Sequence, residues 1–275
     1  MHKVCRYIVI MMVLAVAVPD CAWAGKNKKP IVITSFEPDP VPTQQKASPD
    51  SPGADVDQPY AFGGTRSNRK WPTGLQGIDV SHYQGDINWK TVAKDKDAGY
   101  VYIKATEGRD YIDNMYSRNF SEARKHKIPV GSYHFFRPGV SAEVQYQNFI
   151  SAINIKHQDL VPLVDVETIS GVNSIATFHT RLLEFCRLLT QAFKGRKPMI
   201  YTGRNFYNKY FAGYPQFREY NFMIAQYQGG EPELDGGDDY LIWQYTGKGK
   251  MTGIRGDVDR SCFRGGHTLD EIRIR

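Results

Sequence analysis

The chain has 275 residues, of which 41% are hydrophobic and 23% are charged, a balance typical of a globular protein. This composition excludes a wholly disordered chain, a collagen and a membrane protein with many spans, and 4 cysteines are too few for a disulfide scaffold. The net charge of +6 suits an anionic polymer as a partner. No segment interleaves Lys and Arg with aromatic residues, so we expect no nucleic-acid partner.

The N-terminus predicts an export signal. Lys3 and Arg6 precede the apolar run 8–18, and the Ala-Trp-Ala at 22–24 supplies small residues around a cleavage point. A basic start, a short apolar centre and an A-x-A end are typical of a secretory signal peptide, and the run is shorter than the roughly 18 residues of a spanning helix. We expect residues 1–24 to send the protein to the periplasm or out of the cell, with membrane contact only if the signal stays uncleaved.

Cys186 and Cys262 remain after this signal. An oxidising compartment permits a disulfide between them, but pairing needs Cα atoms within about 7 Å, which the sequence does not reveal. A Cys186–Cys262 bridge and two separately buried thiols both stay open.

Residues 25–73 predict a linker. The segment holds eight of the 15 prolines and is rich in polar residues. Proline removes the backbone donors that helices and central strands need, so we expect an extended, mostly disordered connection.

Residues 74–275 predict one α/β domain, in which short apolar runs alternate with segments of helical periodicity. The predicted strands are 77–80, 100–104, 130–135, 163–167, 199–201, 222–225, 241–244 and 258–259, and the predicted helices are 113–127, 141–155 and 173–193. This alternation favours a parallel sheet, and eight strands favour closure into a barrel. A complete (β/α)8 barrel usually needs about 250 residues. We therefore expect an incomplete TIM-like barrel that lacks helices towards its C-terminal end.

The strand at 163–167 carries two acids. Side chains alternate along a strand, so Asp165 and Glu167 share one face while Val164 and Val166 share the other. With the valines packed outward, the acids point to the barrel axis at the strand's C-terminal end, where barrel enzymes place catalysis. A structural ion pair with Lys104, the one obvious inward partner, is the alternative.

Two more acids stand on the first and last strands. Asp79 and Asp259 are expected side by side, because these strands are neighbours in a closed barrel; a turn or helix cap is the alternative for Asp259. Two close carboxyls are what glycoside hydrolysis requires. Aromatic residues on the same strands suit sugar faces, although each one alone also fits core packing; among them are Tyr102, Tyr133, Tyr201 and Trp243. The scattered His residues make a metal site improbable.

Several motifs, taken together, resemble the glycoside hydrolase family 25 lysozymes. The first is GIDVSHYQG at 77–85, in which Tyr83 stands where the family usually has Trp. The others are YIKATEG (102–108), GSYHF (131–135), PLVDVE (162–167), IYT (200–202), AQY (225–227), WQYT (243–246) and VD (258–259). The resemblance covers essentially residues 75–263.

The resemblance implies a flattened (β/α)5β3 barrel and a muramidase that cuts the β-1,4 bond between N-acetylmuramic acid and N-acetylglucosamine in peptidoglycan glycan strands. It implies that Glu167 is the general acid and that Asp79 and Asp259 line the groove. Asp165 either attacks directly or orients the substrate's 2-acetamido group for attack. The residues expected to bind sugar are Tyr133, Tyr201, Tyr102, Gln226 and Trp243. We expect a monomer that uses no cofactor and no metal.

Two other functions compete with this one. A peptidoglycan-binding module without catalysis is conceivable on the same fold, although all four acids are retained. A chitinase-like hydrolase would share the D-x-E spacing, but its longer pattern needs Asp where this chain has Leu160 and Leu163.

Overall fold

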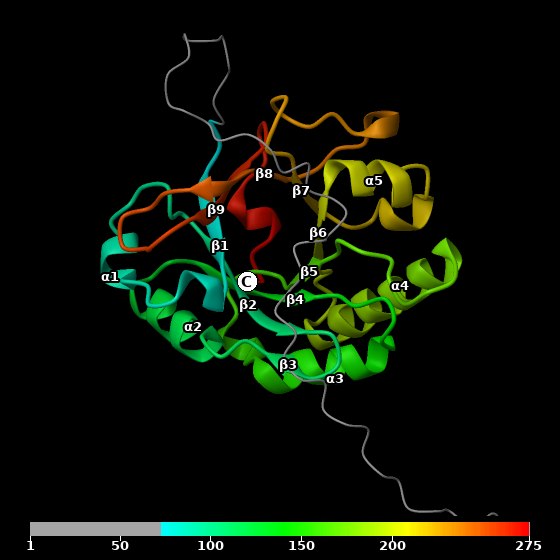
Figure 1. Ribbon diagram of the computed structural model, residues 1–275, viewed down its shortest axis with the longest axis horizontal. Coiled ribbons are helices and arrows are strands. Elements are labelled where there is room, and N and C mark those ends of the chain that lie inside the picture. Colours follow the sequence, from blue (N-terminus) through cyan, green and yellow to red (C-terminus); the bar gives the residue numbers. More distant parts are fainter. Residues whose placement is uncertain (1–72, 275) are drawn as a thin grey trace, which may run out of the picture. The chain divides into compact units, whose positions relative to one another are not determined.

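A computed structural model describes residues 73–274 of the chain (Figure 1). The predicted signal at 1–24 and the predicted linker at 25–73 lie outside the described residues, apart from Thr73. The described residues belong to one compact unit. Within the described part, no helix is both long and apolar enough to cross a membrane.

The strands form a single sheet that closes on itself. Its order is β1-β9-β8-β7-β6-β5-β4-β2-β3, and β1 also pairs with β2, which closes an eight-stranded barrel and leaves β3 outside it. The strands are β1 (Gln76–Val80), β2 (Val101–Glu107), β3 (Tyr111–Ile112), β4 (Val130–Phe135), β5 (Leu163–Asp165), β6 (Met199–Gly203), β7 (Phe222–Ala225), β8 (Ile242–Gly249) and β9 (Val258–Phe263). The predicted incomplete barrel is confirmed.

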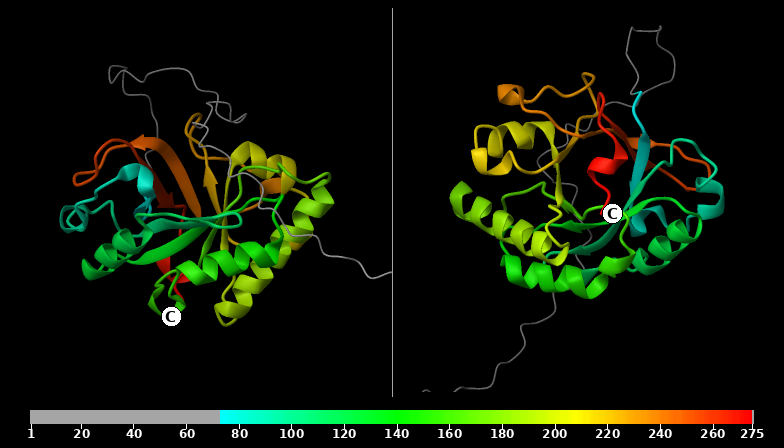
Figure 2. Two further views of the ribbon diagram at one scale, coloured as in Figure 1. Left: turned by 60° about the horizontal axis from the view of Figure 1, so that its bottom comes forward. Right: turned by 180° about the vertical axis from the view of Figure 1, so that it is seen from behind.

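Five α-helices connect the first six barrel strands. They are α1 (Trp89–Val92), α2 (Tyr116–Lys125), α3 (Ala142–Ala152), α4 (Ile175–Ala192) and α5 (Arg204–Tyr210). They lie outside the barrel, and the side built from β8 and β9 carries no α-helix (Figures 1 and 2). Five strand–helix units followed by three strands give the expected (β/α)5β3 order.

The last strand departs from the predicted parallel sheet. β9 runs antiparallel to both β8 and β1. Only residues 250–257 join β8 to β9, and an antiparallel pair can use such a short connection, whereas a parallel pair needs a crossover of a dozen or more residues. The short final spacer therefore explains both the missing helix and the reversed strand. The predicted strand at 163–167 also ends earlier, at Asp165.

Alternation along the strands separates an outer and an inner apolar layer. Val164 and Val166 join the outer layer with Phe178 and Phe185 of α4, whereas Leu163 joins the barrel interior. This is the orientation that the period-two pattern predicts for the strand. Cys186 and Cys262 are both buried free thiols, so they form no disulfide in the structure.

Phe185 anchors α4 to the barrel and is the basis of a stability prediction. Its ring is fully buried, with centroids 5.5 Å from Phe136 and 5.0 Å from His134. Phe185→Ala is expected to lower the free energy of unfolding by about 3–5 kcal/mol, because the cavity is lined by a rigid barrel wall. Urea unfolding followed by circular dichroism checks this. Glu184→Gln, at an exposed position on the same helix, is the control, and equal midpoints for the two variants would contradict the packing described.

Candidate active site

The four predicted acids gather at one rim of the barrel. Asp79 lies in β1 and Asp165 ends β5, with Glu167 two residues later. Because β9 runs antiparallel, Asp259 near its start lies directly opposite Asp79 in the strand register. The expectation that Asp79 and Asp259 lie side by side is confirmed by this register.

Asp165 and Glu167 occupy different environments. Asp165 is 9% exposed, and its Oδ1 is buried without a hydrogen-bond partner among the described residues. Glu167 keeps an exposed side chain. The strand end thus presents a recessed carboxyl with one oxygen unused and, beside it, a carboxyl that an arriving molecule can touch.

Burial raises the pKa of both acids at this strand end. For Asp165 the main cause is burial, followed by the charge of Glu167, and its pKa lies well above its usual value. Protein packed around the Glu167 carboxyl displaces part of its water and raises its pKa, although the side chain stays exposed at its outer side. Lys104 and Arg137 lower this pKa, and the negative charge of Glu107 raises it. Such interacting carboxyls lose their protons as a set, so the pair retains a proton at pH values where isolated carboxyls are ionised.

Asp79 and Asp259 form a second interacting pair. Burial raises the pKa of Asp79 to about 6, although a hydrogen bond from Gln244 lowers it. Burial and the adjacent charge of Asp79 raise the pKa of Asp259 to about 9. Between these two values the pair shares one proton, so it carries one negative charge at neutral pH.

Gln244 links this acid pair to two tyrosines. Its Nε2 donates to Asp79 Oδ2 at 2.9 Å, and its Oε1 accepts from the hydroxyls of Tyr201 at 2.9 Å and Tyr227 at 2.7 Å. Gln244 was not among the predicted site residues. The alternation of side chains along β8 could have predicted it. Ile242 faces the barrel interior, so Gln244, two residues later, faces the interior as well.

Replacing Gln244 tests this network. Gln244→Leu removes the bond that lowers the pKa of Asp79, so this pKa is expected to rise above about 6. Loss of the acceptor for Tyr201 and Tyr227 is expected to cost about 1–3 kcal/mol of stability. Carboxyl titration by ¹³C NMR and urea unfolding measure the two effects. An unchanged Asp79 titration would show that the bond is unimportant.

Lys104 does not pair with the catalytic candidates. Its Nζ donates to Glu107 Oε2 at 2.7 Å, and within residues 73–274 no ion pair joins it to Asp165 or Glu167. Arg137 binds the other oxygen of Glu107, with Nε 2.9 Å from Oε1. The structure therefore does not contain the alternative in which Lys104 forms an ion pair with Asp165 or Glu167. Glu107 and Arg137 were not predicted as site residues.

Two of the predicted sugar-binding residues lie near the acids. Tyr133 is half-buried, and burial followed by the charge of Asp165 raises the pKa of its hydroxyl. Tyr201 pairs in register with Asp165, but its hydroxyl is already committed to Gln244. Tyr133 is therefore the better placed of the two to donate to an arriving group.

The other three predicted sugar-binding residues point elsewhere. Tyr102 is fully buried in the barrel interior, and its hydroxyl donates to the Val161 carbonyl at 3.1 Å. Gln226 uses its Nε2 on the Gly230 carbonyl at 2.9 Å. Trp243 belongs to the outer layer, and its Nε1 donates to the Gln226 carbonyl at 2.8 Å. Alternation along β8 explains the position of Trp243, which faces outward because Gln244 faces inward.

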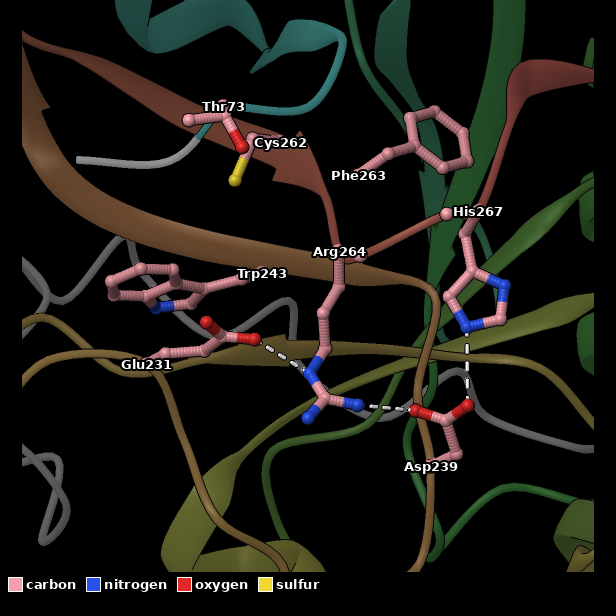
Figure 3. A pocket seen from close by; sticks show the side chains of 10 residues that line it. Thr73, Glu231, Asp239, Trp243, Cys262, Phe263, Arg264 and His267 are labelled. Atoms are coloured by element: carbon pink, nitrogen blue, oxygen red, sulfur yellow. Dashed lines mark hydrogen bonds and ion pairs between the residues drawn. The ribbon is translucent and has the colours of Figure 1, made fainter. Parts of the chain in front are cut away.

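Trp243 instead borders a separate depression of about 370 Å³ (Figure 3). At its centre Arg264 binds Glu231 and Asp239, and His267 contacts Asp239 at 3.1 Å. None of the four acids lines this depression. No grouping of three or more His, Cys, Asp or Glu able to hold a metal ion occurs in the part of the chain that the structure describes.

The model of the family "Glycosyl hydrolases family 25" matches residues 78–254. The chain belongs to glycosyl hydrolase family 25. The match begins in β1 and covers strands β1 to β8, so it includes Asp79, Asp165 and Glu167.

Several known proteins resemble this chain in sequence or in structure. Lysozyme M1 of Streptomyces globisporus is 31% identical over 203 residues, covering 70% of this chain and 69% of the relative. An uncharacterized protein of Escherichia coli K12, YegX, is 36% identical, with 72% of each chain covered. The lysozyme structure from Streptomyces coelicolor superposes with a TM-score of 0.64 at 32% identity, covering 70% of this chain and 93% of that one. A family 25 structure from Bacillus anthracis gives 0.65 at 28% identity, covering 76% and 98%.

Proposed function

We propose that this family 25 glycoside hydrolase is a muramidase that cuts the β-1,4 bond between N-acetylmuramic acid and N-acetylglucosamine in peptidoglycan. The observation that carries the proposal is the strand end at which exposed Glu167 lies beside recessed Asp165, whose Oδ1 has no partner. The relatives named lysozyme and N,O-diacetylmuramidase support the same activity.

Glu167 is the general acid in this proposal. A general acid must be protonated at working pH and must reach the leaving oxygen. The exposed side chain of Glu167 meets the second condition, and its raised pKa favours the first. The proton passes from Glu167 to the glycosidic oxygen as the bond to the anomeric carbon breaks.

Asp165 orients the 2-acetamido group of the sugar whose anomeric carbon reacts. Its recessed position and unused oxygen suit acceptance of the acetamido N–H, so that the acetamido carbonyl attacks the anomeric carbon from within the substrate. Tyr133, also beside Asp165, supplies a hydroxyl donor to the same group. Direct attack by Asp165 is the alternative, and the two routes differ in their intermediates.

Asp79 and Asp259 lie on neighbouring strands at the same rim of the barrel. Because the pair shares one proton at neutral pH, it offers one acceptor and one donor to sugar hydroxyls. Its single negative charge also stabilises the positive charge that develops on the sugar ring. Peptidoglycan lies outside the cytoplasmic membrane, so this function agrees with the predicted export signal and a periplasmic or secreted location.

The purified chain incubated with peptidoglycan sacculi tests the proposal. Release of soluble glycan fragments is expected from the unaltered protein, little from Glu167→Gln, and a normal amount from Glu184→Gln, whose carboxyl is exposed on α4. Sacculus binding without release by the unaltered protein would instead support a non-catalytic binding module. Cleavage of chitin oligomers with no action on sacculi would support the chitinase-like alternative. The chitinase pattern needs Asp at positions 160 and 163, where this chain has leucines buried in the barrel interior.

A further inference from the structure

Glu107 binds two cations at the barrel rim, two strands away from Asp165. Its Oε2 accepts from Lys104 Nζ at 2.7 Å, and its Oε1 accepts from Arg137 Nε at 2.9 Å. We call Glu107, Lys104 and Arg137 the cation clamp. The proposed mechanism gives none of the three a role.

Glu107 holds Lys104, a buried cation that acts on Asp165 and Glu167. It is 8% exposed, and its Nζ lies 5.4 Å from the ring centroid of Tyr111 and 5.3 Å from that of Phe135. Such a buried ammonium needs an acceptor, because an unpaired charge away from water is costly. The nearby alternatives to Glu107 are Asp165 and Glu167, whose protonation Lys104 already opposes.

Arg137 is fixed in the same way. Its guanidinium donates to Glu107 and lies 4.4 Å from the ring centroid of Phe135, the ring that Lys104 also contacts. The position of Glu107 itself is set by its place at the end of β2 and by Asn148, whose Nδ2 donates to the carbonyls of Glu107, Gly108 and Tyr111. The clamp is therefore a built feature of the barrel rim and not a chance surface pair.

We infer that Glu107 is a positioning residue that holds Lys104 and Arg137 away from Glu167, so that the general acid keeps its proton. This inference rests on the proposed role of Glu167. Without Glu107, two uncompensated cations would border the groove, and Glu167 would be drawn into an ion pair as a carboxylate. A carboxylate cannot protonate the leaving oxygen.

Several charged and titratable groups surround Glu167, and among them Glu107 is the carboxylate that binds Lys104 and Arg137. Asp165 on β5, Asp79 on β1 and Asp259 on β9 repel a negative charge on Glu167. Tyr201 on β6 and Tyr227 after β7 also lie within its electrostatic reach. Lys104 and Arg137 are the cations that act on Glu167, and both are bound by Glu107.

The test is the pH dependence of kcat/KM for Glu107→Gln. Loss of the clamp charge is expected to lower the pKa of Glu167 by about one unit, the smaller end of the effect of an adjacent opposite charge. Activity that requires protonated Glu167 falls as pH rises through this pKa, so the high-pH limb is expected to move to lower pH. On that limb a shift of one unit lowers activity about tenfold. Lys104→Met in the Glu107→Gln background is expected to move the limb back.

Glu122→Gln is the matched control, because Glu122 binds Lys125 in an exposed pair on α2. Its pH profile is expected to match that of the unaltered protein. If Glu107→Gln unfolds, as judged by circular dichroism, Lys104→Met alone decides: removal of the cation is expected to move the same limb to higher pH. An unmoved limb in a folded Glu107→Gln, or in Lys104→Met, would overturn the inference.

Titration of the Glu167 carboxyl by ¹³C NMR separates this inference from the proposed function. A lower Glu167 pKa in Glu107→Gln supports the clamp whether or not the protein cleaves glycan. An inactive unaltered protein, or a fully active Glu167→Gln, would remove the proposed function instead. An unchanged Glu167 pKa in a working muramidase would remove only the role given to Glu107.

Discussion

Glu167→Gln is expected to lower kcat on peptidoglycan by about 10²–10⁴-fold, the usual loss when a general acid is removed. The amide has nearly the same shape and remains exposed at the strand end, but it has no proton to give to the leaving oxygen. Initial rates of glycan release from sacculi measure the effect. Binding of sacculi is expected to persist, because the groove is otherwise unchanged.

Two comparisons make this result specific. The thermal unfolding of Glu167→Gln should match that of the unaltered protein, since an exposed side chain contributes little to the core. Glu184→Gln on the outer helix α4 should retain full activity. Near-normal turnover by a folded Glu167→Gln would remove Glu167 from its assigned role, and the proton donor would have to be sought among Asp79, Asp165 and Asp259.

Asp165→Ala has the second largest expected effect, about 10²–10³-fold in kcat, because the 2-acetamido group loses the acceptor that places its carbonyl under the anomeric carbon. The measurement is the initial rate on sacculi, with KM determined separately. A smaller change in KM than in kcat is expected, since the orientation matters most as the bond breaks. A rate equal to that of the unaltered protein would contradict any role for Asp165.

Azide added to Asp165→Ala distinguishes the two routes. If the acetamido group attacks, azide opens the resulting ring from the opposite face and the product is a β-glycosyl azide. If Asp165 is the nucleophile, azide takes its place on the far face of the sugar and the product is an α-glycosyl azide. We expect the β product, and the α product would assign direct attack to Asp165.

The strand faces were the most predictable part of the site. The alternation of side chains along a strand predicts that Asp165 and Glu167 face away from Val164 and Val166. In the structure both valines pack in the outer apolar layer. The pairing of Asp79 with Asp259 followed from barrel closure alone. The first prediction rests on local geometry, which a sequence records directly, and the second on the closure of an eight-stranded barrel.

The facing of Trp243 is less accessible from sequence. In WQYT at 243–246 the motif alone does not say whether Trp243 or Gln244 faces the barrel. The neighbouring Ile242, which fills the interior, decides for Gln244. The depth of Tyr102 in the barrel is equally invisible in the sequence: it packs with Leu160 and Val161 in the interior.

The cation clamp depends on contacts that no local pattern contains. Arg137 follows β4 and reaches Glu107 across 30 positions of sequence. Lys104 and Glu107 are three residues apart in β2, where a strand without a bulge would place them on opposite faces. The register shift between Lys104 and Thr106 changes that alternation. Such irregularities arise from tertiary packing and become visible only in the folded chain.

The central claim is that this groove cuts next to the muramic acid, with Glu167 as acid. The most direct test digests purified sacculi with the protein and with Glu167→Gln, reduces the products with borohydride and identifies the reduced sugar by mass spectrometry. The account predicts reduced muramic acid from the unaltered protein and almost none from the variant. Reduced glucosamine, or equal yields from both proteins, would contradict it.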